Sequence, residues 1–337
     1  MDTDKIETIA TEHFGLGQVS ATRAVRSGHI NATAVVETDD GSVIIQELNT
    51  QVFPDPESLM ENTVRIIERQ QARNLATMTF LRTTDGEWMT NRAGSLWRCY
   101  RYLDGAATPS ITSPEEAQRT ARAFGRYAGA IDGLELAAHL PGYHDFDGRI
   151  AALEEAVTAD TFARLSDCRE FTDNLMAVID RVRLTSGYRS LKSVPVRNAH
   201  NDAKGPNCIV GTTGSRTIID LDTTMPGTVI SDIGELVRSS TRHLPDAPAD
   251  VLWAQIEAVN RGFLVGSGFM FSPEERDAML LAGPLMAVEN AARFLTDHLR
   301  GDGYYGADTP GQNLDRAVAQ YDLGRRLVGA IEWATSS

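Results

Sequence analysis

Residues 198–210 of this 337-residue chain read Asn-Ala-His-Asn-Asp-Ala-Lys-Gly-Pro-Asn-Cys-Ile-Val. The polar part has the pattern His-x-Asp-x-Lys-x-x-Asn, and the last three residues form a short apolar run that indicates a β-strand. One loop therefore carries a carboxylate, an ammonium group and a side-chain amide, from Asp202, Lys204 and Asn207. The prediction of the fold class and the prediction of the chemistry both start from this loop.

Phosphoryl transfer requires the three side-chain types that this loop supplies. The reaction needs a carboxylate to orient and deprotonate the attacking hydroxyl, a cation near the γ-phosphate and a neutral oxygen ligand for Mg²⁺. Asp202, Lys204 and Asn207 offer these groups in that order. The three side-chain types together make this loop a candidate phosphoryl-transfer site.

A second apolar run supplies an acidic pair. It reads Thr-Ile-Ile-Asp-Leu-Asp at 217–222 and follows a Gly-Thr-Thr-Gly-Ser turn. We expect the two strands to form a hairpin that returns Asp220 and Asp222 to the neighbourhood of Asn207. Because Mg²⁺ prefers oxygen ligands, these three residues are candidate metal ligands.

The first third of the chain carries the signals of a small β-sheet. Residues 34–46 contain two apolar, β-branched runs separated by an Asp-Asp-Gly turn, a pattern typical of a β-hairpin. Asp55 followed by Pro56 indicates the capped start of a helix, and strand-like runs return at 77–81 and 96–103. We expect a sheet with one helix in this part.

Helix dominates after residue 113. The tetrapeptide Ser-Pro-Glu-Glu at 113–116 is a capping box that opens an amphipathic helix, and it recurs at 272–275. With a hinge expected at Asp104-Gly105, we predict an α+β protein whose sheet part spans 1–103 and whose mainly helical part spans 104–337. Further helices are expected near 149–157, 172–184, 232–242, 249–263 and 278–299.

Composition excludes several classes of function. The chain has 46 acidic and 32 basic residues, a net charge of −14, which argues against a nucleic acid or an anionic membrane as a partner. Its three cysteines are widely spaced and predict neither a disulfide framework nor a zinc site. The acidic first residues are unlike a secretory signal, and the apolar run 279–288 is short and broken by Gly283 and Pro284, so we expect a buried helix rather than a membrane span. The expected localisation is cytoplasmic.

The loop at 198–210, together with the Ile-Asp pair 18 residues beyond Asp202, resembles the protein-kinase-like fold, in particular the aminoglycoside phosphotransferase and choline kinase superfamily. The chain resembles the N-acetylhexosamine 1-kinases still more closely, over nearly its whole length. This resemblance implies a two-lobed fold in which 1–103 binds the nucleotide and 104–337 carries the catalytic and acceptor-binding residues. The blocks that carry it are 46–56, 59–62, 141–145, 220–227, 293–297 and 301–305.

The resemblance implies a role for each reactive residue. Asp202 is the expected catalytic base, and Lys204 is expected to contact the γ-phosphate of ATP. Asn207 and Asp220 are the expected Mg²⁺ ligands, whereas Asp222 would hold a second metal ion or a bound water. We favour Asp220 as the main carboxylate ligand because it directly follows the apolar strand, as the family pattern requires.

Two further polar residues are expected to support the loop rather than to react. His200 should pack and hydrogen-bond within it, as the corresponding histidine does in kinase-like loops. Asp232, which opens a helix, is interpreted as an N-cap or as a buttress of the loop.

One position departs from the general kinase pattern. The third strand of a kinase-like N-terminal lobe normally ends in a lysine that pairs with the donor phosphates, but Gln46 occupies that position here. An amide can donate hydrogen bonds but supplies no charge. We therefore expect either that Arg65, Arg69 or Arg92 compensates, or that metal and Lys204 carry more of the phosphate charge.

The resemblance also implies contacts for the nucleotide and the acceptor. The Gly-His-Ile-Asn-Ala-Thr turn at 28–33 corresponds to the nucleotide-covering loop, so His29 and Asn31 are candidates for the donor, although a polar hairpin tip explains them equally well. Sugar contacts are expected from Arg293 and Tyr304, with His144 as a further candidate. For Arg293 the alternative is an ordinary salt bridge to the glutamate one helical turn earlier.

These implications predict an ATP- and Mg²⁺-dependent kinase that converts an N-acetylhexosamine to its sugar 1-phosphate. One alternative is a kinase for an aminoglycoside, a nucleoside antibiotic or another hydroxylated metabolite. A second alternative, motivated by Gln46, is a nucleotide-binding regulator without turnover. The expected partners are a nucleotide and a small sugar acceptor, bound by a monomer or a homodimer.

Overall fold

The computed structural model describes residues 3–25, 30–108 and 111–336. The chain divides into two compact units, each built from several segments. Unit 1 contains residues 1–107, 134–140 and 209–225, and unit 2 contains 108–133, 141–208 and 226–337. The first segment of unit 1 ends at Ala107, near the expected hinge, and two later segments of the chain also belong to this unit.

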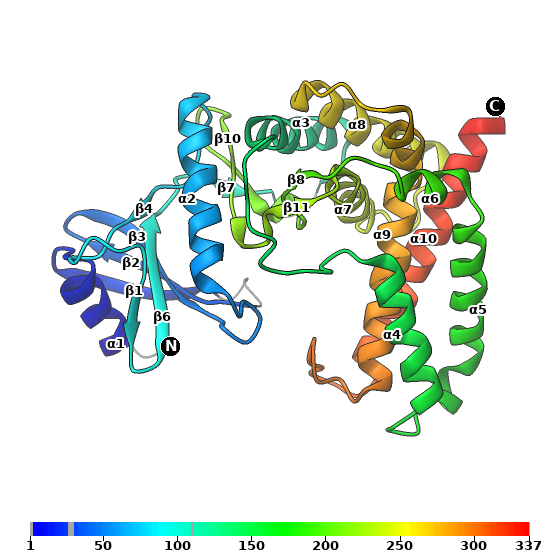
Figure 1. Ribbon diagram of the computed structural model, residues 1–337, viewed down its shortest axis with the longest axis horizontal. Coiled ribbons are helices and arrows are strands. Elements are labelled where there is room, and N and C mark those ends of the chain that lie inside the picture. Colours follow the sequence, from blue (N-terminus) through cyan, green and yellow to red (C-terminus); the bar gives the residue numbers. More distant parts are fainter. Residues whose placement is uncertain (1–2, 26–29, 109–110, 337) are drawn as a thin grey trace. The chain divides into compact units, whose positions relative to one another are not determined.

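Unit 1 is built on an antiparallel sheet whose strands β1, β2, β3, β6 and β4 follow one another in that order (Figure 1). Strand β5 also pairs with β6. The predicted hairpin is confirmed, because β2 and β3 pair with Thr38 opposite Gly41 around the Asp-Asp turn. The strands are β1 (Val19–Val25), β2 (Ala32–Thr38), β3 (Gly41–Leu48), β4 (Phe80–Leu81), β5 (Thr90–Arg92) and β6 (Ser95–Arg101).

One face of this sheet is covered by the start of the chain. Helix α1 (Thr3–Thr8) continues into a π-helical turn at Ile9–His13, and Ile6 and Ile9 pack with inward-facing residues of the strands, including Val36 and Ile45. The sequence predicted only one helix here, α2 (Pro56–Ala72), whose start is confirmed because the carboxylate of Asp55 accepts a hydrogen bond from Ser58. A small sheet of β10 (Arg216–Ile218), β9 (Cys208–Val210) and β7 (Ala106–Ala107) follows.

Unit 2 is mainly helical, as predicted. In Figure 1, the long helix α9, in orange, runs alongside α10, in red. Two short strands, β8 (Arg197–Ala199) and β11 (Met225–Gly227), pair with each other. Strand β8 leads into the loop at 200–207, and β11 leads into α7. The helices are α3 (Pro114–Ile131), α4 (Phe146–Ala159), α5 (Leu165–Arg183), α6 (Ser186–Leu191), α7 (Val229–Thr241), α8 (Ala249–Ser267), α9 (Pro273–Leu299) and α10 (Gln312–Ser336).

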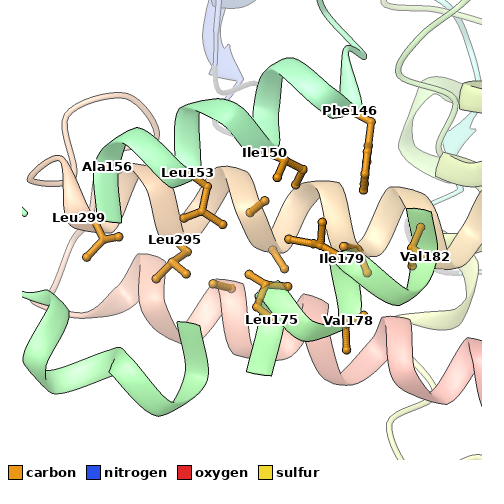
Figure 2. Packing of buried hydrophobic residues seen from close by; sticks show 14 of the residues in the cluster. Phe146, Ile150, Leu153, Ala156, Leu175, Val178, Ile179, Val182, Leu295 and Leu299 are labelled. Carbon is orange, nitrogen blue, oxygen red and sulfur yellow. The ribbon is translucent and has the colours of Figure 1, made fainter. Parts of the chain in front are cut away.

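One hydrophobic core of unit 2 lies where α4 and α5 pack against α9. Ile150, Leu153, Leu175 and Leu295 are fully buried in it (Figure 2). The run 279–288 lies inside α9 and is mostly buried, which confirms the buried helix expected there. In the part of the chain that the structure describes, no helix is long and apolar enough to cross a membrane.

The capping box predicted at the start of α9 is present. The hydroxyl of Ser272 accepts a hydrogen bond from the backbone N–H of Glu275, and the Glu275 carboxylate accepts one from the N–H of Ser272. We expect Ser272→Ala to lower the free energy of unfolding by about 0.5–2 kcal/mol, because the backbone N–H of Glu275 loses its side-chain acceptor. Ser272→Gly is the matched control and should cost only a few tenths of a kcal/mol. Equal urea midpoints for Ser272→Ala and the wild type would show that the cap contributes nothing.

Candidate active site

The candidate catalytic loop, residues 200–207, lies in unit 2 after β8 and ends in a 3₁₀-helical turn at Gly205–Asn207. This turn brings three predicted residues together. The Lys204 ammonium donates to Oδ2 of Asp202 at 2.6 Å, and Nδ2 of Asn207 donates to the same oxygen at 2.9 Å. Gly205 makes the close approach possible, since a Cβ here would lie 2.4 Å from the carbonyl oxygen of Thr108.

The carboxylate of Asp202 is held by one oxygen only. Both side-chain hydrogen bonds end on Oδ2, so Oδ1 accepts none from the residues that the structure describes. The side chain is 22 % exposed. Oδ1 is therefore available to accept a proton from a hydroxyl group.

Asn207 is oriented in the same way. Its Nδ2 also donates to the backbone carbonyl of Asp202 at 2.9 Å, so the amide nitrogen is fully used. Within the described ranges its Oδ1 accepts no hydrogen bond. A neutral oxygen fixed in this manner fits a Mg²⁺ ligand.

Buried groups hold the backbone of the loop. The carboxylate of Asp232, which is 1 % exposed, accepts from the N–H of His200 at 2.9 Å and from the N–H of Asn201 at 2.7 Å. Burial raises the pKa of this carboxyl group. The loop-buttress interpretation of Asp232 is thus confirmed, while the N-cap of α7 is Thr228.

His200 supports the loop as expected. Its ring is fully buried and contacts the rings of Phe124 and Tyr127 edge-on, with centroids 5.3 and 5.6 Å away. Its Nδ1 accepts a hydrogen bond from the N–H of Asp202 at 3.3 Å. His200 therefore packs in the core and holds the backbone of Asp202.

The acidic pair lies in unit 1, after β10. Asp220 has a left-handed backbone (φ 61°) and is the residue before a 3₁₀ turn at Leu221–Thr223. Asp222 is 2 % exposed, and its Oδ2 accepts from Asn31 at 2.8 Å and from Arg98 at 2.7 Å. Asp222 is therefore tied into the sheet of unit 1 by two side chains.

Arg98 is the cation beside Gln46, and the sequence analysis did not identify it. Oε1 of Gln46 accepts from Arg98 at 2.8 and 2.5 Å, and Nε2 of Gln46 donates to Thr33 at 3.0 Å. Arg98 is 3 % exposed and lies opposite Gln46 in the β3–β6 register. An arginine between the buried Trp97 and Cys99 of a central strand was the available signal.

The three arginines proposed to compensate for Gln46 do not contact it. Arg65 pairs with Glu61 and Arg92 with Glu12, both on the surface. In the described part of the chain, Arg69 also makes no hydrogen bond to Gln46. The arginine that contacts Gln46 is a different one, Arg98, which the strand register brings to that face.

Two residues were expected to contact the nucleotide, His29 and Asn31, and the structure describes only the second. His29 lies outside the described residues. Asn31 is engaged at both ends of its amide, because Nδ2 donates to Asp222 and Oδ1 accepts from the N–H of Asn49 at 2.9 Å. Asn31 therefore anchors the base of the β1–β2 turn to Asp222.

The candidate acceptor residues form two groups in unit 2. The guanidinium of Arg293 lies 5.5 Å from the ring centroid of Tyr305, which stacks edge-on with Tyr304, and the Nε of Arg293 has no hydrogen-bond partner among the described residues. Glu289 does not pair with Arg293. Its Oε1 lies 3.2 Å from Nδ1 of His144. Glu289 and His144 both line a cavity of about 210 Å³ among α4, α6, α7 and α9.

A magnesium site would need ligands beyond the protein. The structure, in its described residues, has no group of three or more His, Cys, Asp and Glu side chains that could hold a metal ion. Mg²⁺ in phosphoryl-transfer sites commonly uses one or two carboxylates and completes its octahedron with phosphates and water. The amide oxygen of Asn207 in unit 2 and the carboxylates of the acidic pair in unit 1 are each ligand types that fit this mode of binding.

Residues 21–264 match the phosphotransferase enzyme family, and the chain belongs to this family. It is therefore a phosphotransferase that acts on a hydroxyl group. The same residues include the catalytic loop and the acidic pair.

Solved structures share the fold. An aminoglycoside phosphotransferase from Alicyclobacillus acidocaldarius is 12 % identical, with a TM-score of 0.63, and covers 94 % of this chain and 93 % of its own. Spectinomycin phosphotransferase bound to ADP and spectinomycin is 10 % identical, with a TM-score of 0.64 and 98 % of both chains covered. Amicoumacin kinase bound to AMP-PNP and Ca²⁺ is 13 % identical, with a TM-score of 0.64, covering 97 % of this chain and 94 % of its own. These similarities confirm the predicted kinase-like fold.

Proposed function

We propose that this phosphotransferase moves the γ-phosphoryl group of ATP to the anomeric hydroxyl of an N-acetylhexosamine and releases the sugar 1-phosphate. The observation that carries the chemistry is the geometry of Asp202, whose Oδ2 is held by Lys204 and Asn207 while Oδ1 accepts no bond from the described residues. The choice of acceptor is supported by the sequence blocks shared with N-acetylhexosamine 1-kinases.

In this proposal Asp202 orients the sugar hydroxyl and accepts its proton on Oδ1. The hydroxyl oxygen forms a bond to the γ-phosphorus as the bond from that phosphorus to the bridging oxygen of ADP breaks. Lys204 keeps Oδ2 fixed through its 2.6 Å contact and supplies positive charge close to the transferring group. The products are ADP and the sugar phosphate.

Asn207 and Asp220 are the proposed ligands of Mg²⁺. The Oδ1 of Asn207 supports this choice, because its amide nitrogen is committed to Asp202. Asp222 is a weaker candidate, since its Oδ2 already accepts from Asn31 and Arg98. When bound, Mg²⁺ would neutralise part of the charge on the β- and γ-phosphates.

ATP as the donor is supported by the nucleotides in the similar structures, which are ADP in one and AMP-PNP in another. What disfavours a regulator without turnover is the match to the phosphotransferase family. The amide oxygen of Gln46 is bound by Arg98, whose charge is already paired with Asp222.

The second candidate function is antibiotic phosphorylation. It is favoured by the similarity to two antibiotic-modifying enzymes, a spectinomycin phosphotransferase and an amicoumacin kinase. Such an enzyme would use the same Asp202, Lys204 and Asn207 and would differ only in the residues that contact the acceptor.

An acceptor panel separates these functions. The purified protein is incubated with Mg·ATP and hexoses, hexosamines, N-acetylhexosamines and aminoglycosides, and products are identified by mass spectrometry before and after mild acid. We expect a phosphate that mild acid removes, on an N-acetylhexosamine, because anomeric phosphates are acid-labile. An acid-stable phosphate, or a product only with an antibiotic, would contradict the sugar 1-kinase, and no product with any acceptor would favour the regulator.

A further inference from the structure

The residue before the catalytic base has an unusual backbone. Asn201 has φ 65°, in the left-handed region that non-glycine residues rarely adopt. Such a conformation persists only where surrounding groups determine it, and it is common at active sites. In this loop, Asp232 accepts the N–H of Asn201 at 2.7 Å and so fixes the peptide on its amino side.

The peptide on the other side of Asn201 is held at both ends by histidines. Nε2 of His144 lies 2.7 Å from the carbonyl oxygen of Asn201, and Nδ1 of His200 lies 3.3 Å from the N–H of Asp202. This peptide links Asn201 to Asp202, so its plane sets the direction in which the Asp202 side chain leaves the backbone. His200 belongs to the loop itself, whereas His144 comes from the segment before α4.

The two contacts of the His144 ring fit a doubly protonated imidazole beside an ionised Glu289. A carbonyl oxygen only accepts, so the Nε2 that faces Asn201 must carry a hydrogen. The Nδ1 faces Oε1 of Glu289 at 3.2 Å, and an ionised carboxylate also only accepts, so Nδ1 must carry a hydrogen too. An imidazolium ring is the form that donates to both partners.

The surroundings favour this ion pair. The side chain of Glu289 is 3 % exposed and that of His144 is 11 % exposed. Burial of the ring disfavours its charged form, but the hydrogen bond and the charge of Glu289 outweigh it and raise the pKa of His144. Glu289 is buried in the middle of α9, which gives the pair a rigid base.

We propose that His144 and Glu289 are a positioning pair for the catalytic loop: Glu289 holds the imidazolium of His144, whose Nε2–H fixes the carbonyl of Asn201 and with it the direction of Asp202. The proposal rests on the phosphotransfer role of Asp202. It replaces the expectation that His144 is a sugar contact, because both ring nitrogens are engaged by the protein.

Two isosteric variants separate the two contacts of His144. In His144→Gln, the amide nitrogen occupies the place of Nε2 and can still donate to Asn201. In His144→Asn, the shorter amide occupies the place of Nδ1 and can reach Glu289 but not Asn201. We expect kcat to fall ~10–100-fold in His144→Asn and much less in His144→Gln, with KM for ATP and for the acceptor nearly unchanged in both.

Amide hydrogen exchange of a peptide covering 200–204 gives a readout that does not depend on activity. We expect faster exchange in His144→Asn than in His144→Gln or the wild type, because only the first variant releases the carbonyl of Asn201. Glu289→Gln should show an intermediate effect, since the ring stays but loses its anionic partner. Melting temperatures of all variants report on folding.

The outcomes are distinct. Equal kcat values and equal exchange in the Gln and Asn variants would overturn the positioning role, and a rise in acceptor KM without a change in kcat would restore His144 as a substrate contact. If the wild type turns over no acceptor, the proposed function fails, but the exchange comparison still decides whether His144 holds the loop.

Discussion

Replacing Asp202 with asparagine is expected to lower kcat by about 10²–10⁴-fold and to leave the affinity for ATP nearly unchanged. Asparagine is nearly the same size and its amide oxygen can still accept from Lys204 and Asn207, which both donate to Oδ2 of Asp202. What the variant loses is a carboxylate oxygen that can take the proton of the attacking hydroxyl. Steady-state kinetics and calorimetric titration with the nucleotide measure the two quantities separately.

A charge-matched control is available on the same unit. Asp246 is exposed in the segment between α7 and α8, so Asp246→Asn removes the same charge away from the loop and should leave kcat unchanged. Near-normal turnover by Asp202→Asn would show that another group accepts the proton. A parallel loss of ATP affinity would show instead that Asp202 acts mainly in binding.

Local signals predicted much of the fold. The capped starts of α2 and α9 lie where a side-chain acceptor precedes a proline, and the β2–β3 hairpin lies where an Asp-Asp-Gly turn separates two β-branched runs. These features depend on contacts between residues a few positions apart. The π-helical turn at Ile9–His13 was missed because it has no such signal and is held by packing against strands much later in the chain.

In the candidate site too, contacts between residues close in sequence could be predicted, and contacts between distant residues could not. Asp202, Lys204 and Asn207 could be grouped from the sequence because a single short turn brings them together. The partner of Gln46 could not, because Arg98 reaches it through strand register across 52 positions of the chain. The Glu289–His144 contact likewise joins residues 145 positions apart, whereas the sequence offered only Arg293, one helical turn later, as an alternative partner of Glu289.

The buried ion pair of unit 1 is the second place where a large effect is expected. Arg98 and Asp222 are each 3 % exposed as side chains, with N and O 2.7 Å apart, and Gln46 and Asn31 complete their hydrogen bonds. Removing one partner of such a pair leaves a charge buried without compensation, which costs far more than the pair contributes. We therefore expect Arg98→Met to lower the free energy of unfolding by about 3–5 kcal/mol, measured from urea denaturation.

Two comparisons make this expectation specific to the ion pair. Arg101 lies on the same strand, but its guanidinium donates to the carbonyl of Asp40 at the surface, so Arg101→Met should cost less than about 1 kcal/mol. Adding Asp222→Asn to Arg98→Met removes the orphaned charge and should recover much of the lost stability, since Asn31 can still donate to the new amide oxygen. If Arg98→Met unfolds at the same urea concentration as Arg101→Met, or if the second substitution recovers nothing, then the buried charge of Asp222 does not depend on Arg98. In that case the carboxylate of Asp222 would be in contact with water, and Asp222 would again be a candidate metal ligand.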